Sequence, residues 1–258
     1  MSSKIYNALQ LIRKGHFIVL LNEFKKRIYS RSVSIGLQRD LNDEYQAPSA
    51  KIDIQVRKLR KEDVAELLDP TSDPTINPRI IANQLSMVNA NIPTCFVAVT
   101  TDDKPCYMQW LIGNDKNQDI EKHFKGVFPA LKKSEALLEG AYSNPAYRGL
   151  RIMPMAMALI AEKATEINAR WVNTFVDVTN IPSLKGCQRS GFKPYLIRKD
   201  HWFLFQLSST FHPITDTMDN HFYVITDSVK NKPSKKSQIP ETKHTPKLEK
   251  KLSNGISK

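Results

Sequence analysis

The sequence has few residues of the kinds that build metal centres or disulfide scaffolds. Its 258 residues include only three cysteines, Cys95, Cys106 and Cys187, which are widely spaced and form no Cys-x-x-Cys pair. Its six histidines show no i, i+4 pairing. An odd, dispersed set of cysteines argues against a disulfide framework and against a thiolate zinc site. We therefore expect neither structural disulfides nor a bound metal.

Long hydrophobic runs are also missing. A membrane span needs about 18–20 apolar residues, and the best candidate, 17–21, is a short run closed by Glu23 and Lys25. This segment also lacks the small-residue cleavage site of a secretory signal. The sequence predicts a cytoplasmic protein, with peripheral contact at a membrane surface left open.

The net charge of +12 is unevenly distributed along the chain. Residues 228–258 carry nine lysines and two glutamates, and residues 1–45 carry a further net charge of +4. The middle of the chain is therefore nearly neutral. Basic chain ends bind weakly to anionic surfaces, including membranes, and do not recognise a nucleotide sequence. We expect no sequence-specific nucleic-acid partner, although a tether working through the basic ends remains one alternative function.

Composition and periodicity divide the chain into three parts. Residues 1–45 form a helical, amphipathic, basic leader, which Gly15 breaks into two helices. This leader either packs on the main domain or lies on an anionic membrane. Residues 46–227 form the folded domain. Residues 228–258, rich in lysine and proline, cannot bury enough apolar surface to fold, and we predict a disordered basic tail.

The middle part alternates between strand and helix patterns. Turn chemistry at 102–105 joins two apolar strands, and 198–201 is expected to form a second hairpin turn. The order predicts an α/β (α+β) fold with a mixed, mostly antiparallel sheet flanked by helices. The expected strands are 52–57, 94–99, 107–112, 136–143, 171–178, 195–197, 202–207 and 221–226, and the expected helices are 59–68, 78–88, 152–168 and 182–189.

The junction at 144–151 carries the chemistry. A strand that ends in a tight turn and opens directly into a helix directs free backbone N–H groups at one point, which suits a diphosphate. Pro154 falls in the first helical turn, where its missing N–H costs nothing. Arg148 and Arg151 add positive charge. The junction therefore predicts an anion site.

Two motifs together resemble the GNAT superfamily of N-acetyltransferases. The run Asn144-Pro-Ala-Tyr-Arg-Gly-Leu-Arg-Ile152 before a helix is similar to that superfamily's acyl-CoA pyrophosphate loop. Asn180-x-x-Ser183, followed by Gly191-Phe192, resembles the next motif. The likeness covers residues 52–207. It implies a GNAT-like fold, an acetyl-CoA or other acyl-CoA cofactor, and transfer of the acyl group to a primary amine.

The resemblance also implies a set of site residues. The sheet would open between the strands ending near residues 143 and 178, with the pantetheine arm in the opening. The residues implied for binding the cofactor are Ala141, Tyr142, Ser143, Arg148, Gly149, Leu150, Arg151, Ile152, Met153, Asn180 and Ser183. Glu139 stands where the family often places a catalytic carboxylate; its alternative is a solvated or salt-bridged glutamate.

Three positions depart from the family pattern. Arg151 and Met153 stand where small residues are usual, so Arg151 either pairs with phosphate or marks a loop that has lost the cofactor. Cys187 stands where a tyrosine often acts as the acid toward the leaving thiolate. A thiol can donate a proton, but a lone cysteine in a helix is also a common packing residue. Tyr142 and Tyr147 either orient substrate or pack.

The sequence does not identify the acyl acceptor. The predicted acceptor-side loops, 70–93 and 114–134, carry no carboxylate cluster that would indicate a polyamine or a lysine peptide. A faint resemblance to members of bacterial surface-polysaccharide synthesis suggests an amino sugar as the small-molecule acceptor. The alternative function is a non-catalytic binding module that keeps the fold but has a degenerate cofactor loop.

Overall fold

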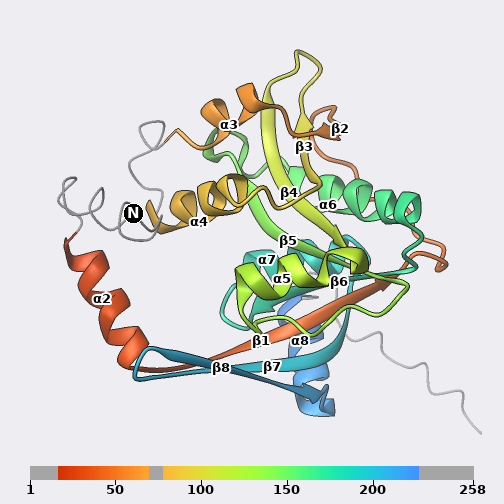
Figure 1. Ribbon diagram of the computed structural model, residues 1–258. Coiled ribbons are helices and arrows are strands. Elements are labelled where there is room, and N and C mark those ends of the chain that lie inside the picture. Colours follow the sequence, from red (N-terminus) through yellow and green to blue (C-terminus); the bar gives the residue numbers. More distant parts are fainter. Residues whose placement is uncertain (1–16, 70–77, 227–258) are drawn as a thin grey trace, which may run out of the picture. The chain divides into compact units, whose positions relative to one another are not determined.

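The computed structural model describes residues 17–69 and 78–226, and these contain one eight-stranded sheet with the order β2-β3-β4-β5-β6-β1-β7-β8 (Figure 1). Neighbouring strands are antiparallel except for β5 and β6, which are parallel. This is the mixed, mostly antiparallel sheet that the sequence predicts. The strands are β1 (Tyr29–Asp40), β2 (Gln55–Lys58), β3 (Cys95–Val99), β4 (Pro105–Gly113), β5 (Glu135–Ser143), β6 (Trp171–Asp177), β7 (Lys193–Phe203) and β8 (Gln206–Pro213).

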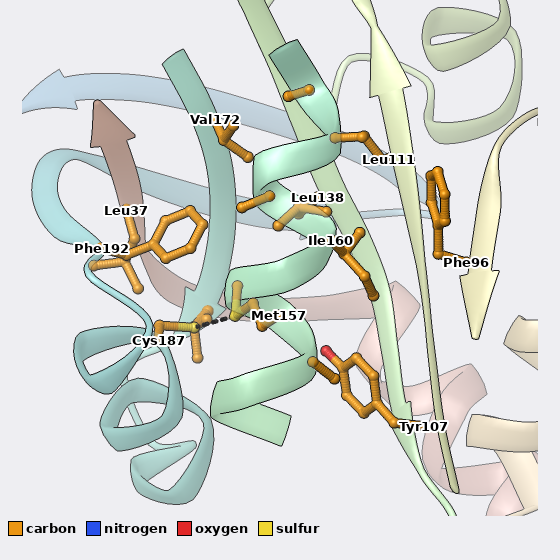
Figure 2. Packing of buried hydrophobic residues seen from close by; sticks show 14 of the residues in the cluster. Leu37, Phe96, Tyr107, Leu111, Leu138, Met157, Ile160, Val172, Cys187 and Phe192 are labelled. Atoms are coloured by element: carbon orange, nitrogen blue, oxygen red, sulfur yellow. Dashed lines mark hydrogen bonds between the residues drawn. The ribbon is translucent and has the colours of Figure 1, made fainter. Parts of the chain in front are cut away.

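Helices cover both faces of the sheet. Those of the described residues are α2 (Phe17–Ile28), α3 (Lys61–Leu67), α4 (Pro78–Asn89), α5 (Asn117–Phe124), α6 (Ile152–Glu162), α7 (Ile181–Arg189) and α8 (Asp216–Thr226). On one face α6, α7 and α8 pack into a core cluster with Leu138 and Val172 of the strands (Figure 2). On the other face, α3, α4 and α5 pack against Trp110 and Leu137. The sheet is therefore the middle layer of three.

Strands β5 and β6 separate part of the way along their length. They pair only over residues 135–137 and 171–173. In β5 the register with β4 then shifts between Met108 and Trp110, and Gly140 opposite this shift has a φ of 67°. A Cβ at Gly140 would lie 2.7 Å from the Trp110 ring, so this bulge needs a glycine. The bulge bends β5 away from β6 and opens the sheet, as the resemblance implies.

The predicted leader, residues 1–45, is wrong at its C-terminal end. Its second helix is present as α2, whereas residues 1–16 lie outside the described part of the chain. Tyr29–Asp40, however, is strand β1, which lies between β6 and β7 in the sheet. Ile35 and Leu37, two residues apart, are fully buried in the core. This period-2 alternation of apolar residues is typical of a strand. The folded domain therefore includes residues that the sequence prediction places in the leader. The predicted disordered tail at 228–258 lies outside the described residues.

The predicted hairpin turn at 198–201 is also wrong. These residues continue strand β7, which runs without interruption to Phe203. Arg198 and Asp200 suggest a turn because they are polar, but they pair with each other at 3.0 Å. Ser209 of β8 also donates to Asp200, and the Arg198 guanidinium donates to Ser34 of β1. Because their polar groups are satisfied across the sheet, both residues fit inside a strand.

The actual turn lies at Leu204-Phe205 between β7 and β8. Both residues have positive φ, 44° and 66°. A two-residue turn of this hand normally carries Asn-Gly, because a β-carbon in the left-handed region costs about 1 kcal/mol or more per residue. Because neither residue is typical of turns, the sequence does not predict this hairpin.

The strand predicted at 221–226 is part of helix α8. The helix begins at Asp216, and the Thr215 hydroxyl accepts a hydrogen bond from the Met218 N–H at 3.4 Å. Asp216 and Asp219 place negative charge in the first turn, where it stabilises a helix. Phe222 is fully buried against the core. The helix start lies upstream of the apolar residues on which the strand prediction rested.

Candidate active site

The loop between β5 and α6 is held by its first residue. The Asn144 N–H donates to the Cys106 carbonyl at 3.0 Å, which ties the loop to β4. The Asn144 side chain accepts from the Ala146 N–H at 3.1 Å, and a 3₁₀ turn, Pro145–Tyr147, follows. Asparagine is suited to this position because its short amide mimics a backbone turn. The loop therefore leaves the strand in one direction and delivers the chain to the start of α6.

Two residues at positive φ then turn the chain into the helix. Gly149 has a φ of 80°, and Arg151, the residue before α6, has a φ of 58°. No heavy atom would lie within 4 Å of a Cβ at Gly149, so there the glycine serves conformation rather than space. Arg151 keeps the left-handed conformation in spite of its side chain, at a cost of about 1 kcal/mol. The loop thus has glycine-like geometry at a position that carries an arginine.

The N-terminus of α6 is open toward solvent. No side chain caps it, and the first N–H groups of a helix have no acceptor within the helix. The helix dipole adds partial positive charge there. Arg148 and Arg151 are exposed beside it, and neither forms an ion pair with an acid in the described part of the chain. This combination of backbone donors and cations fits a phosphate or a diphosphate.

A cleft of about 690 Å³, which we name the loop-side cleft, lies above this helix start. It is lined by ten of the eleven residues that the sequence implies for cofactor binding: Ala141, Tyr142, Ser143, Arg148, Gly149, Arg151, Ile152, Met153, Asn180 and Ser183. The remaining one, Leu150, packs against the core, and its carbonyl accepts from Lys51. The volume lies in the range of small-molecule sites. The structure thus brings these residues together in one cleft.

Met153, the second departure from the family pattern, has a specific place. A Cβ added at Gly186 on α7 would lie 2.8 Å from the Met153 sulfur. The methionine side chain therefore occupies the space that the missing side chain of Gly186 leaves. Because α7 has no side chain at Gly186, Met153 fits into the wall of the cleft without closing the cleft.

A second cleft of about 290 Å³, the carboxylate-side cleft, continues from the first. The residues that line both are Ile80, Ala141, Met153, Asn180 and Ser183. The second cleft reaches Gln84 of α4 on one face of the sheet and Cys187 of α7 on the other. The opening between β5 and β6 is therefore a passage that joins the two faces.

Glu139 lines the carboxylate-side cleft at the end of the regular part of β5. Burial raises the pKa of its carboxyl, and the Gly140 N–H and the charge of Arg198 only partly oppose that effect. A carboxylate with a raised pKa accepts a proton more readily at neutral pH, which suits a general base. Glu139 is half-buried, and its catalytic role stays a prediction beside the alternative of a solvated or salt-bridged glutamate.

The sequence did not single out two amides in the same cleft. The Gln84 side-chain oxygen is buried and has no hydrogen-bond partner among the described residues. Gln109 of β4 is 1% exposed and accepts from the Tyr107 hydroxyl at 2.7 Å. A buried acceptor without a donor is costly, and a ligand N–H or O–H would satisfy it. Gln84 therefore marks a position for a donor group of a ligand.

Cys187 is placed as a core residue. It is 1% exposed, and its thiol lies 3.8 Å from the Met157 sulfur of α6 (Figure 2). Burial raises the pKa of this thiol to about 12. Cys187 touches the wall of the carboxylate-side cleft, but its S–H is directed into the core. These surroundings favour packing, and the catalytic role stays a prediction.

Asn180 and Ser183 lie at the start of α7. The Asn180 side chain accepts from the Ser183 N–H at 3.3 Å and so caps the helix. Both residues border both clefts. Both tyrosines line the loop-side cleft: Tyr147 is half-buried there, and Tyr142 is buried and also packs with the α4 face. The cap explains why an asparagine stands before this helix, and the exposed side of the amide borders the groove.

No group of three histidine, cysteine, aspartate or glutamate side chains within 17–69 and 78–226 is placed to hold a metal ion. In the same residues, no helix has the length and apolarity to cross a bilayer.

Comparison with known proteins adds evidence on the fold. No family model matches the sequence, and no curated protein matches it. Among solved structures, the chain is similar to a fungal multi-domain GH3 β-N-acetylglucosaminidase with a GCN5-related glucosamine N-acetyltransferase region. That likeness has 14% identity and a TM-score of 0.50, and it covers 74% of this chain and 22% of the fungal one.

Two bacterial structures are similar at lower TM-scores. A GCN5-related N-acetyltransferase from Sphaerobacter thermophilus is 14% identical, with a TM-score of 0.44 and coverage of 76% of this chain and 57% of that one. A GNAT-family acetyltransferase from Colwellia psychrerythraea is 11% identical, with a TM-score of 0.45 and coverage of 73% and 59%. The chain thus spans less than two thirds of each of these proteins. The likeness to the fungal structure, with 14% identity and a TM-score of 0.50, bears on the fold alone.

Proposed function

Because the chain has the fold of the GNAT N-acetyltransferases, we propose that it is an acyl-CoA-dependent N-acyltransferase that transfers an acetyl or another acyl group to a primary amine. One observation carries the proposal. A single groove through the open sheet joins an uncapped helix N-terminus with two arginines to a carboxylate whose pKa is raised. A phosphate-bearing donor and a proton acceptor are the two requirements of such a transfer.

The loop-side cleft fits acyl-CoA. Backbone N–H groups at Ile152 and Met153, together with Arg148 and Arg151, would hold the pyrophosphate. The β5 residues Ala141–Ser143 line the same cleft, where the edge of β5 is freed from β6 and offers backbone groups to a pantetheine arm. Bound there, acyl-CoA would supply the acyl group as a thioester.

The carboxylate-side cleft fits the amine. Glu139 would take a proton from the amine, directly or through a water molecule. The freed N–H groups of β5 beyond the bulge at Gly140 would stabilise the negative charge that develops on the carbonyl oxygen. Glu139 and the bulge are adjacent in sequence, so one strand supplies both the base and the oxyanion donor.

The lining of this cleft bears on the kind of acceptor. It presents the neutral polar groups Gln84, Gln109 and Thr174 in addition to two carboxylates, Glu139 and Asp177. Asp177 accepts hydrogen bonds from the N–H and the hydroxyl of Thr179. A volume of about 290 Å³ suits a small molecule rather than a protein segment. We propose a small amine that carries further hydroxyl or amide donors, one of which would reach the Gln84 oxygen. An amino sugar has this chemistry.

An assay of free CoA tests the proposal. The protein is incubated with acetyl-CoA and a panel of amines (glucosamine-type sugars, polyamines and amino acids), and thiol release is followed together with the mass of the acetylated product. We expect an amine-dependent rate that the Glu139→Gln variant lacks. Absence of turnover with every amine, in a preparation that binds acetyl-CoA, would leave a binding module and end the catalytic proposal.

That binding module is the second candidate, and one observation favours it. At position 187, where the resemblance implies an acid, the thiol is directed into the core and has a pKa raised to about 12. A module that only binds acyl-CoA needs neither acid nor base. Its signature is acetyl-CoA affinity that is the same in the wild type and in Glu139→Gln, without turnover in either.

A further inference from the structure

Exposed apolar side chains gather where the end of α2, the start of β1 and the β7–β8 turn meet. Seven of the ten large hydrophobic side chains that are exposed in the described residues belong to α2, the start of β1 and the β7–β8 turn. We define six of them as the apolar tip: Phe24, Ile28, Tyr29, Phe203, Leu204 and Phe205, which are 40–61% exposed. Single exposed apolar residues are ordinary, but a continuous group marks an interaction surface.

The apolar tip is one continuous structure. The Leu204 N–H donates to the Ile28 carbonyl at 3.0 Å, and the Phe205 N–H donates to the Arg27 carbonyl at 2.8 Å. The end of α2 is thus bonded to the hairpin turn. The rings of Phe24 and Phe205 pack edge to face at a centroid distance of 5.1 Å. Tyr29 pairs with Phe203 across the two strands.

The backbone of the turn is strained, and its two N–H bonds to α2 do not require a leucine or a phenylalanine. Leu204 and Phe205 both occupy the left-handed region, where asparagine and glycine would be unstrained. Neither side chain recovers this cost by burial, because they are 61% and 50% exposed. Backbone strain that persists without a packing reward points to a function. The turn presents a leucine and a phenylalanine outward.

Positive charge surrounds the apolar tip. Lys25, Lys26 and Arg27 form the last turn of α2, and Arg31 follows on β1. The Arg27 guanidinium lies 5.6 Å from the centre of the Trp202 ring, and that of Arg31 lies 5.7 Å from the centre of the Tyr29 ring. Aromatic and aliphatic side chains with cations beside them match the boundary between lipid headgroups and acyl chains.

The charges also argue against a second copy of the chain as the occupant. Protein interfaces are depleted of lysine at their centre, and a symmetric pair of tips would bring these cations together. The tip projects from the sheet, because Ser34 of β1 pairs with Asp177, the last residue of β6. The five residues of β1 before Ser34 extend beyond β6 by about 17 Å (Figure 1).

We propose that the apolar tip is a docking surface for an anionic lipid bilayer. Leu204 and Phe205 insert at the level of the headgroups and the upper acyl chains, and the neighbouring lysines and arginines contact the anionic headgroups. The groove opens between β5 and β6 beyond residues 137 and 173 and so lies at the end of the sheet from which the tip projects. Docking holds the enzyme at the membrane with its substrate groove near the surface.

The test is flotation of the full chain with vesicles of phosphatidylcholine alone or with 30% phosphatidylglycerol, a share on the order of that in anionic membranes. We expect binding to the anionic vesicles, weakened by salt, and at least tenfold weaker binding for Leu204→Asn/Phe205→Gly. Because Asn-Gly suits this turn, the double variant should melt at the same temperature as the wild type or higher, so unfolding cannot explain the loss. Val224→Asn, which removes an aliphatic side chain that is 71% exposed on α8, is the matched control and should bind as the wild type does.

Three results would overturn the proposal. The first is absence of binding to anionic vesicles at millimolar lipid. The second is equal binding by the wild type and the double variant, which would assign the attraction to the basic tail at 228–258. The third is a concentration-dependent dimer in light scattering that the double variant loses, without vesicle binding, which would assign the tip to self-association.

Discussion

The two halves of the groove are built from different parts of the chain. In the loop-side cleft the binding groups are backbone N–H groups at a helix start, supported by two exposed arginines. In the carboxylate-side cleft the candidate groups are side chains, above all the half-buried Glu139 and the buried Gln84. A half that would bind through the backbone tolerates side-chain change, so Arg151 and Met153 are compatible with the proposed cofactor site. A half that acts through side chains has no such freedom.

The largest difference between the halves is expected from Glu139→Gln. We expect kcat/KM to fall by about 10²-fold or more, because the amine loses its proton acceptor. The affinity for acetyl-CoA should stay within about twofold of the wild type, since Glu139 lies in the other half. Glu135→Gln, on the same strand, is the control and should keep its activity. A Glu139→Gln variant with full activity would remove the assigned base.

The reaction rate and the stability of the protein should both depend on pH through the titration of the Glu139 carboxyl. Burial raises the Glu139 pKa, so the rate should fall as the pH is lowered through a value above the usual carboxyl range of about 4. The stabilising contribution of the neutral carboxyl is full below the pKa of the unfolded chain and is lost as the pH rises through the raised folded pKa. Glu139→Gln should therefore gain stability relative to the wild type at pH 8 and not at pH 4. Thermal melts at both pH values would measure this, and equal gains at the two would contradict it.

Arg151 tests the opposite half. Arg151→Ala and Arg151→Gly both remove the cation, and each should weaken acetyl-CoA binding about tenfold while kcat stays the same. Only glycine relieves the strain at a φ of 58°, so Arg151→Gly should be more stable than Arg151→Ala by about 1 kcal/mol. Chemical denaturation and calorimetry measure the two effects separately. Tighter binding by Arg151→Gly would mean that the arginine obstructs the cofactor.

The smallest effect is expected from Gln84→Met, which keeps the size of the side chain and removes its orphan oxygen. We expect the protein to gain about 1 kcal/mol, because a buried acceptor without a donor is costly. The KM for the amine should rise by about fivefold or more, whereas the acetyl-CoA affinity should not change. Asn89→Met, at an exposed position on the same helix and outside both clefts, is the control. A stability loss in Gln84→Met would mean that Gln84 has a role within the fold.

Much of the fold could be predicted from local sequence signals. Strand β5, the loop at 144–151, α6, β6 and α7 follow in the predicted order, because period-2 and helical patterns meet at clear turn residues. The Leu204-Phe205 turn could not be predicted, since it carries no glycine or asparagine. The start of α8 at Asp216 was missed because the apolar residues after it dominated the pattern.

The two clefts also differ in how far their residues could be predicted from the sequence. The loop-side residues lie in two short segments, 141–153 and 180–183, and each segment belongs to one of the two motifs that the sequence shows. Gln84 and Gln109 come from different elements and meet Glu139 only through the packing of α4 on the open sheet. One signal was present: Gln84 stands three residues after Ile81 and three before Met87, which are both buried, so it is a polar residue on the apolar face of α4.

Calorimetric titration of the full chain with acetyl-CoA tests the central claim most directly. If the loop at 147–153 binds the cofactor through its backbone in spite of Arg151 and Met153, one molecule should bind per chain with a dissociation constant in the micromolar range, on the order of −7 to −8 kcal/mol. Loss of both Arg148 and Arg151 should weaken it strongly. No binding at millimolar acetyl-CoA would contradict the account.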